Sequence, residues 1–346
     1  MKILIVSTHL LKLPISNYGG IEALTYQQAV GLHAKGHQVA IVAPEGSTMP
    51  NGIELIPTGV GEDEKSAYSK YWHRLPEFDV ICDSTWQHWP IILKAEGKLK
   101  APVLIWCHCP VNTLFGSRPP IEKPCFVCIS KDMCNHIKEY FPGCDARLCY
   151  NGVPVDKYRK LDLPRNDNYL FLARFSSIKG ADIAAAACKN TGVFCDFIGD
   201  DTITGEPEYV NNITNECALN PKLRMIGPQS REQCEIWFNR NKCLLHPVQR
   251  YREPFGLTLI ESQLTGMPII SWNHGSPAEL ICTEDGPNRT GFLVNSQEEM
   301  EHLIRTNAVA NINPQRCREW ASQFSYENMI NRVEELCHEA ISTGGW

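Results

Sequence analysis

Glu253 and Glu261 are two carboxylates eight residues apart, and the segment between them has the features of an anion site. Apolar side chains recur at helical intervals after Gly256, which predicts a helix that starts at this glycine. The first N–H groups of a helix, here those of Gly256, Leu257 and Thr258, have no partner inside it, and a glycine lets a ligand approach them closely. The segment therefore predicts an anion site with one acid on either side.

Glu253 and Glu261 would repel a phosphate, so the two acids must bind uncharged groups of the ligand. Hydroxyl-rich groups on either side of a diphosphate, a sugar and a ribose, fit that description. A single glutamate is more often a solvated surface charge. The two glutamates therefore indicate a ligand site only in combination with other features of the chain.

Two cations follow a predicted strand at residues 169–173. Arg174 carries a planar guanidinium group with several N–H donors. Lys179, which precedes Gly180, carries a compact ammonium charge. Both groups are suited to neutralise a diphosphate. Together with the helix start at Gly256, they predict two independent anion-binding elements in one part of the chain: a pair of cations and the N–H groups of a helix start.

Two further features follow predicted strands nearer the amino terminus. His108 comes directly after a predicted strand at 103–107. The pair Gly19–Gly20 closes a loop after the strand at 3–6, and such a pair is as typical of a turn as of a ligand loop.

The composition limits the class of protein. Of 346 residues, 43% are hydrophobic and 21% charged, and no apolar run is long enough to cross a bilayer, so we expect a cytoplasmic protein. Residues 1–160 carry 17 basic and 15 acidic side chains, so the remainder holds an excess of eight acids. The acidic half argues against nucleic acid as a partner. A peripheral membrane contact through the first half stays open.

Sixteen cysteines are spread along the chain, many of them in apolar runs where a free thiol acts as a small hydrophobic side chain. The main alternative to free thiols is a zinc site formed by Cys107, Cys109, Cys125 and Cys128. We disfavour it because Cys107 and Cys109 would project the same way from an extended segment with His108 opposite, and nothing repeats the pattern. The sequence therefore predicts no metal site.

Short apolar runs alternate with helical patterns along the chain, which predicts an α/β protein. The predicted strands are residues 3–6, 39–42, 80–82, 103–107, 126–129, 169–173, 193–198, 223–226, 243–245 and 268–271. We expect two Rossmann-like domains, residues 1–160 and 161–325, that face each other across a cleft. A last helix within 326–346 is expected to pack back on the first domain. Ligands of this fold class bind at the carboxyl ends of the strands.

Several short segments resemble, in order and spacing, the motifs of one enzyme family. They are Gly19-Gly20-Ile21-Glu22, Gly36-His37-Gln38-Val39, Asn151-Gly152-Val153 with Asp156, Arg174 with Lys179-Gly180, Glu253 through Glu261, and Gly275, Glu279, Asp285-Gly286 and Gly291-Phe292-Leu293-Val294. On these residues the chain resembles, over nearly its whole length, a retaining nucleotide-sugar glycosyltransferase of the two-Rossmann-domain (GT-B) type. The family is glycosyltransferase family 4, or glycosyl transferases group 1.

The resemblance implies a role for each candidate residue. Arg174 and Lys179 would hold the donor diphosphate and stabilise the leaving group. Glu253 would accept hydrogen bonds from the donor sugar, and Glu261 would hold the ribose. His108 would contact the donor sugar near its reacting face. The implied catalytic residues are His108, Arg174, Lys179 and Glu253, and the implied donor-binding residues are Gly19, Gly20, Arg174, Lys179, Glu253, Phe255, Gly256, Leu257, Thr258 and Glu261.

The implied activity is transfer of a hexose from a UDP- or GDP-linked sugar to a hydroxyl acceptor with retention of configuration, as in carbohydrate biosynthesis. The acceptor is a glycan, lipid, protein or small molecule, and we expect its site in the loops 7–18, 62–73 and 111–120. No cofactor and no metal are expected. A nucleotide-sugar epimerase or nicotinamide-dependent oxidoreductase and a non-catalytic nucleotide-sugar-binding protein are the alternatives.

Overall fold

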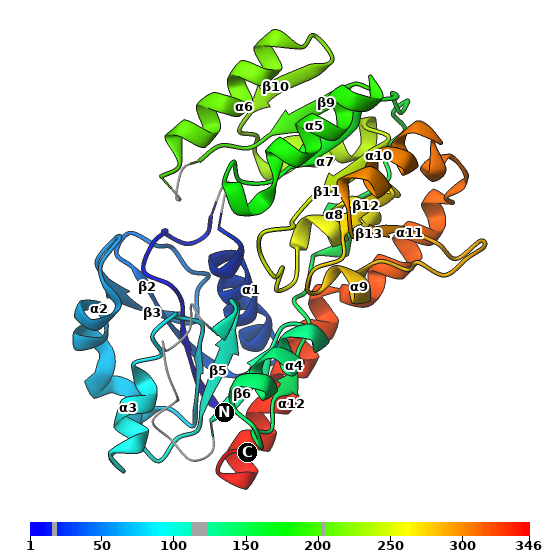
Figure 1. Cartoon of the computed structure of the whole chain (residues 1–346). Coiled ribbons are helices and arrows are strands. Elements are labelled where there is room, and N and C mark those ends of the chain that lie inside the picture. The colour runs from blue at the N-terminus through cyan, green and yellow to red at the C-terminus, as the bar shows by residue number, and fades with distance from the viewer. Residues whose placement is uncertain (16–18, 112–123, 202–204) are drawn as a thin grey trace. The chain divides into compact units, whose positions relative to one another are not determined.

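The computed structural model describes residues 1–15, 19–111, 124–201 and 205–346, and the chain forms two compact units. The first unit is Met1–Gly152 together with Tyr326–Trp346, and the second is Val153–Ser325. Figure 1 shows a sheet with flanking helices in each.

The boundary between the units lies earlier than the predicted division after residue 160. Residues 153–160 belong to the second unit because their partners lie there. The Val153 N–H donates to the Phe324 carbonyl over 3.0 Å, and the Tyr158 hydroxyl donates to Glu261 over 2.8 Å. The sequence did not reveal this because the partners are more than 100 residues away.

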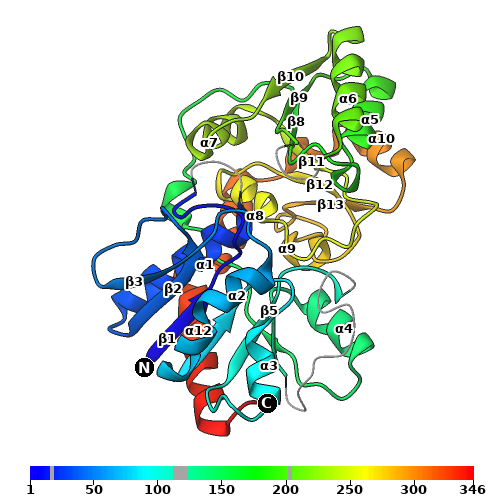
Figure 2. The same ribbon diagram turned by 90° about the vertical axis from the view of Figure 1, so that its left-hand side faces the viewer.

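The first unit contains a parallel sheet of seven strands in the order β3-β2-β1-β4-β5-β6-β7, of which Figure 2 labels β1, β2, β3 and β5. Its strands are β1 Lys2–Val6, β2 Gln38–Pro44, β3 Ile53–Thr58, β4 Val80–Asp83, β5 Val103–Cys107, β6 Cys125–Cys128 and β7 Arg147–Leu148. Its helices are α1 Gly20–Ala34, α2 Glu64–Tyr71, α3 Pro90–Ala95, α4 Lys131–Tyr140 and α12 Tyr326–Thr343. The central strands are buried on both faces and read as apolar runs, as parallel strands must. Helix α4 starts at Ser130, whose hydroxyl accepts from the Met133 N–H over 3.1 Å, so the predicted cap is confirmed.

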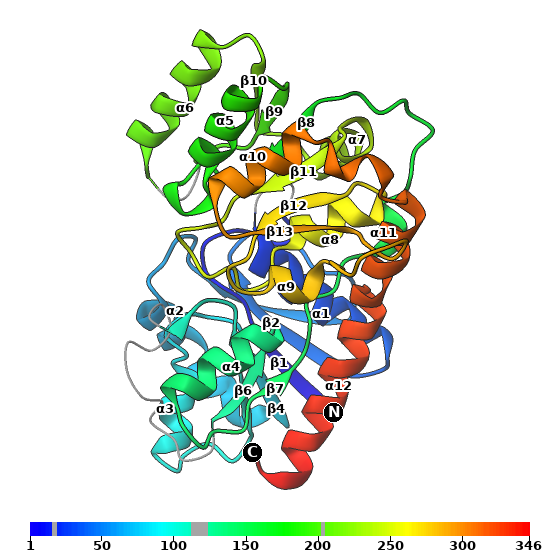
Figure 3. The same ribbon diagram turned by 45° about the vertical axis from the view of Figure 1, so that its right-hand side comes forward.

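The second unit contains six parallel strands in the order β10-β9-β8-β11-β12-β13 (Figure 3). Its strands are β8 Tyr169–Leu172, β9 Cys195–Ile198, β10 Leu223–Gly227, β11 Cys243–His246, β12 Ile269–Trp272 and β13 Gly291–Val294. Its helices are α5 Ala181–Thr191, α6 Pro207–Leu219, α7 Arg231–Arg240, α8 Leu257–Leu264, α9 Pro277–Leu280, α10 Gln297–Arg305 and α11 Pro314–Ala321. None of the helices in the described parts of the chain is long and apolar enough to span a bilayer.

The strand order reverses direction at one point in each sheet. In the first unit this point lies between β1 and β4, and in the second between β8 and β11. The loops that leave neighbouring strands diverge there, and the crevice between them is where this architecture binds ligands. The predicted site residues lie in the loops after β1, β5, β8 and β11 and in helix α8, which follows the last of these loops.

Helix α12 packs on helix α1 within the first unit. Gly31 allows the close approach, because a Cβ there would lie 2.6 Å from both Ile330 Cγ1 and the Tyr326 hydroxyl oxygen. That hydroxyl donates to the Gln27 carbonyl over 2.7 Å. The carboxylate of Glu334 in α12 lies 2.8 Å from His37 Nε2. The last helix is therefore an integral part of the first unit.

We predict that Gly31→Ala destabilises the first unit. In an open helix this change would stabilise by about 1 kcal/mol. Here the added methyl group meets Ile330 and Tyr326, and overpacking costs about 1–3 kcal/mol, so we expect a net loss. Urea unfolding followed by circular dichroism measures it. A raised midpoint would contradict the tight packing of α12 on α1.

Candidate functional site

The second unit brings Lys179 and Glu253 into direct contact, although they lie 74 residues apart in the chain. The Lys179 Nζ atom lies 2.5 Å from Glu253 Oε2. Glu253 is only 5% exposed, so its interpretation as a solvated turn residue is wrong. Lys179 and Glu253, both predicted to bind the donor, therefore form a largely buried ion pair. We use the name Glu253 cluster for Lys179, Glu253 and His246.

The backbone fixes Glu253 against the segment after β12. Its N–H donates to the His274 carbonyl over 3.2 Å, and its carbonyl accepts from the Ser276 N–H over 2.9 Å. Gly275 lies between these partners with φ +93°, and a Cβ there would stand 2.4 Å from the Glu253 carbonyl oxygen. Gly275 must therefore be a glycine for Glu253 to take this position.

A second glycine fixes Lys179. The residue ends the short 3₁₀ turn Ser177–Lys179 after β8, and Gly180 follows in the left-handed conformation with φ +74°. A Cβ at Gly180 would lie 2.2 Å from the Pro247 carbonyl oxygen, so the turn rests directly on the end of β11. Arg174 stands half-buried at the start of the same loop.

The charge of Glu253 depends on its neighbours. Burial alone would raise the pKa of this carboxyl. The Lys179 ammonium, and after it His246, overcome that effect and hold the pKa of Glu253 well below its usual range. The His246 Nε2 atom lies 3.6 Å from Glu253 Oε2. Glu253 is thus an ionised acceptor at neutral pH.

Helix α8 begins beside this cluster. Gly256 takes φ +76° and ψ 72°, and a Cβ on it would lie 3.4 Å from Glu253 Cγ. Gly256, Leu257 and Thr258 are partly exposed, while Phe255 is buried with its ring 6.0 Å from that of Phe324. Within the described residues no side chain caps this helix. The predicted helix start at Gly256 is confirmed, and its first N–H groups lie next to the Glu253 cluster.

Glu261 lies in the second turn of α8 and has a defined partner. Its Oε1 atom accepts from the Tyr158 hydroxyl over 2.8 Å, and Arg231 Nη1 lies 3.9 Å from the same oxygen. The side chain of Glu261 is 12% exposed. Tyr158 therefore orients Glu261.

Sequence reasoning missed two side chains of this region, His246 and Tyr158. His246 carried a usable signal, because it is the polar last residue of an apolar strand. Tyr158 carried none, since the pattern around it is that of a polar linker.

In the first unit, Gly19 and Gly20 lie where the loop after β1 meets α1. Helix α1 starts at Gly20, and Gly19 precedes it with φ +136°. A Cβ on Gly19 would lie 3.0 Å from Leu11 Cδ1 and 3.1 Å from Glu22 Oε2. Gly19 is therefore closely packed at the start of the helix, in a conformation that favours glycine.

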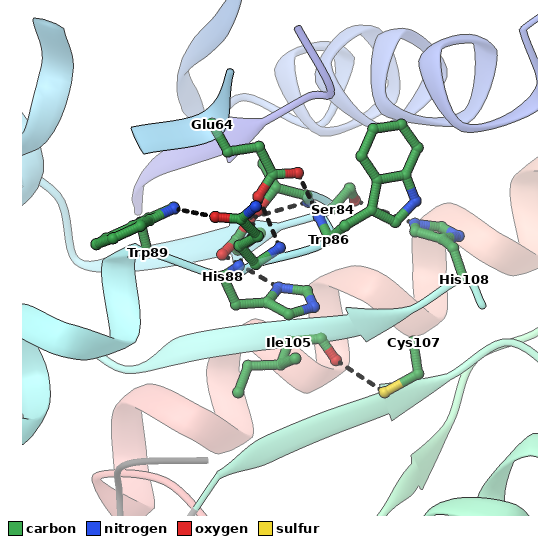
Figure 4. Close-up of polar contacts among 11 residues, drawn as sticks. Glu64, Ser84, Trp86, His88, Trp89, Ile105, Cys107 and His108 are labelled. Carbon is green, nitrogen blue, oxygen red and sulfur yellow. Dashed lines mark hydrogen bonds and ion pairs between the residues drawn. The ribbon is translucent and has the colours of Figure 1, made fainter. Parts of the chain in front are cut away.

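His108 follows β5 and meets the loop after β4 (Figure 4). Its Nε2 atom lies 3.2 Å from Ser84 Oγ, and its ring stacks on Trp106 at 6.1 Å between centroids. Burial lowers the pKa of His108 to about 3, with a further lowering by His88. His108 is thus a neutral hydrogen-bonding group at physiological pH rather than a cation.

Two buried carboxylates shape the loop after β4. Glu64 of helix α2 accepts from the Trp86 and Gln87 N–H groups over 2.7 and 2.6 Å (Figure 4). Asp83 lies 3.2 Å from His88 Nδ1. Of the loops predicted for the acceptor, the one at 62–73 lies within the described part of the chain and is wrong as a loop, because helix α2 spans Glu64–Tyr71. Residues 16–18 of the first predicted loop and 112–120 of the third lie outside the described residues.

Of the cysteines of the zinc alternative, Cys107, Cys125 and Cys128 lie in the neighbouring strands β5 and β6, and Cys109 follows β5. Cys107 and Cys128 are register partners of β5 and β6, and the Cys107 thiol donates to the Ile105 carbonyl over 3.6 Å. In the regions that the structure describes, no group of three or more histidine, cysteine or acidic side chains is placed to hold a metal ion.

Two family models match the chain. Residues 157–323 match glycosyl transferases group 1, and residues 18–157 match glycosyltransferase family 4. A D-inositol 3-phosphate glycosyltransferase of Mycobacterium tuberculosis is 26% identical over 212 residues, which are 58% of this chain and 43% of the relative. An uncharacterized 41.2 kDa protein in the cps region of Klebsiella pneumoniae is 29% identical over 208 residues, 55% of this chain and 54% of that protein. The chain spans about half the length of these curated relatives.

Solved structures share the fold at low sequence identity. Sucrose-phosphate synthase of Thermosynechococcus elongatus has a TM-score of 0.81 and 16% identity over 99% of both chains. The Anabaena protein HepE in complex with UDP has a TM-score of 0.74 and 17% identity over 98% of this chain and 100% of that chain. AviGT4, a glycosyltransferase involved in avilamycin A biosynthesis, has a TM-score of 0.73 and 20% identity over 99% and 98%. The likeness confirms the predicted fold class of two Rossmann-like α/β domains.

We predict that acid destabilises this protein through its buried histidines. Burial lowers the pKa of His9 to about 4 and that of His108 to about 3, so between pH 6.5 and about 4 the unfolded chain binds protons that the folded chain does not. Stability must therefore fall as the pH falls through this window. His108→Gln should reduce the slope of unfolding free energy against pH by up to about 1.4 kcal/mol per pH unit. Urea unfolding at several pH values measures it, and equal slopes for the two proteins would contradict the burial of a neutral His108.

Proposed function

We propose that this chain, which belongs to the glycosyl transferases of group 1, moves a hexose from a nucleoside-diphosphate sugar to a hydroxyl acceptor with retention of configuration. One observation carries the proposal: the largely buried contact of 2.5 Å between Lys179 and Glu253 beside the start of helix α8. A cation and a helix start suit a diphosphate, and the acid between them suits a polyol.

The diphosphate is held by three kinds of positive group in this proposal. Arg174 supplies a planar fork, Lys179 a point charge, and the start of α8 its leading N–H groups. These groups act on the charge that develops as the glycosidic bond to the phosphate breaks, which is where fixed electrostatic groups lower a barrier most. They supply the charge compensation from the protein itself, so we propose a reaction without cofactor or metal.

The two glutamates bind the hydroxyl-bearing parts of the donor. Glu253 accepts from hydroxyls of the sugar, because its ionised carboxylate is a strong acceptor. Glu261 accepts from the ribose, with the Tyr158 hydroxyl holding its Oε1 atom. Buried acceptors of this kind discriminate strongly against a ligand that lacks the hydroxyl.

His108 acts as a neutral partner of the donor sugar. With its pKa lowered to about 3, it donates or accepts a hydrogen bond without bringing a charge. Ser84 fixes its Nε2 side, which leaves Nδ1 as its other polar atom. We propose that attack occurs on the face from which the phosphate departs, as the resemblance to a retaining glycosyltransferase implies.

The donor base is proposed to be uracil. Structures of the Anabaena protein HepE are complexes with UDP, with UDP and glucose, and with UDP-glucose, and they support a UDP-linked sugar. The acceptor is proposed to bind the first unit at residues 7–18, 62–73 and 111–120.

We predict that Lys179→Ala and Glu253→Ala each lower kcat/KM for sugar transfer from UDP-glucose or another UDP-hexose by about 10²–10³-fold, because each removes a buried charge from the donor site. Lys189→Ala is the matched control, since Lys189 is an exposed lysine of helix α5 paired with Glu216. Release of UDP is measured with and without candidate acceptors, and the anomeric configuration of the product by NMR. Turnover retained in both site variants would rule out the proposal, and UDP binding without turnover would favour a non-catalytic binding protein.

A further inference from the structure

His246 stands where three elements of the second unit meet. It is the last residue of β11, is 5% exposed, and is the register partner of Ser271 in β12. Pro247, the next residue, places its carbonyl oxygen against Gly180. The end of β11 therefore fixes both the imidazole and the turn that carries Lys179.

The two ring nitrogens of His246 have different partners. Nδ1 lies 3.0 Å from Ser271 Oγ, and Nε2 lies 3.6 Å from Glu253 Oε2. A bare lone pair on Nε2 would face the negative charge of Glu253, so the network assigns the proton to Nε2. The Ser271 hydroxyl is compatible with this assignment, because it can donate to a bare Nδ1, or accept from Nδ1–H while it donates to the Trp272 carbonyl at 3.1 Å.

Lys179 faces two competing demands. In this structure it pairs with Glu253, whereas in the proposed function it also neutralises a diphosphate. If Lys179 turned to the diphosphate, Glu253 would remain as a buried charge without its cation, which is strongly unfavourable. His246 is the second group that approaches the same oxygen, Oε2.

We infer that His246 is a positioning residue, whose Nε2–H holds the Glu253 carboxylate in place while Lys179 turns from that carboxylate to the donor diphosphate. The inference rests on the proposed function. It adds to it the group that allows Lys179 to leave Glu253 and bind the diphosphate. At 3.6 Å the contact is longer than a hydrogen bond, and contacts of this kind commonly tighten when a ligand binds.

The first test needs no ligand. Proton–nitrogen correlation NMR of the histidine side chains at pH 7 reports which ring nitrogen carries the proton, and His246→Asn assigns the signal. We expect a protonated Nε2 in His246. A ring that carries its only proton on Nδ1 would overturn the inference.

The second test measures UDP affinity by calorimetry. A glutamine at position 246 can place an N–H near the former Nε2, whereas an asparagine reaches only toward Ser271. We expect His246→Asn to weaken UDP binding about tenfold and His246→Gln to restore most of it. His302→Gln, at an exposed position of helix α10, is the matched control and should leave the affinity as it is.

A Glu253→Gln background separates positioning from a general structural role. Glutamine has no charge that needs a partner when Lys179 leaves, so His246→Asn should then change UDP affinity less than twofold. An equal loss of affinity in both backgrounds would overturn the inference.

Failure of the proposed function gives a different result from failure of the inference about His246. In that case the wild-type protein binds neither UDP nor GDP and transfers no sugar, and the role of His246 toward Lys179 falls with it. Failure of the inference alone is a wild-type protein that binds UDP while His246→Asn binds it equally well.

Discussion

The ion pair between Lys179 and Glu253 constrains the second unit more than any surface charge does, because little water reaches it. The side chains are 19% and 7% exposed. A carboxylate at this depth is tolerable only with a partner, since an uncompensated buried charge costs several kcal/mol. Both the loop after β8 and the segment after β11 must therefore be placed accurately for the unit to be stable.

Main-chain contacts supply that accuracy. The Lys179 turn rests on the Pro247 carbonyl through Gly180, and Glu253 pairs with the backbone at Gly275. In both places a side chain larger than hydrogen would collide with a carbonyl oxygen rather than with a movable side chain. The charges of the cluster thus stand on strand ends and paired backbone, and they are held before any ligand arrives.

The sequence predicted the parts of the fold that are strongly apolar. Buried parallel strands such as β1 and β5 appear as continuous hydrophobic runs. Strand β3 was missed because it alternates buried and exposed residues and includes Pro57, and helix α6 because only Ile213 and Cys217 of it are buried. At the site, residue types alone led to the hypothesis of a diphosphate site at Arg174, Lys179 and the start of α8. The direct pairing of Lys179 with Glu253, and the contacts of His246 and Tyr158, depend on tertiary placement that no local pattern encodes.

Burial has opposite outcomes at His108 and at the Glu253 cluster, and the difference agrees with the roles proposed for them. Desolvation disfavours charge on any group. At His108 the Asp83 carboxylate offsets only part of this effect and the imidazole stays neutral, whereas Glu253 has Lys179 and stays ionised. A neutral imidazole can bond a sugar hydroxyl without attracting the leaving diphosphate to itself. An ionised acid beside the Lys179 ammonium can hold a polyol next to a positive group, which is the role proposed for Glu253.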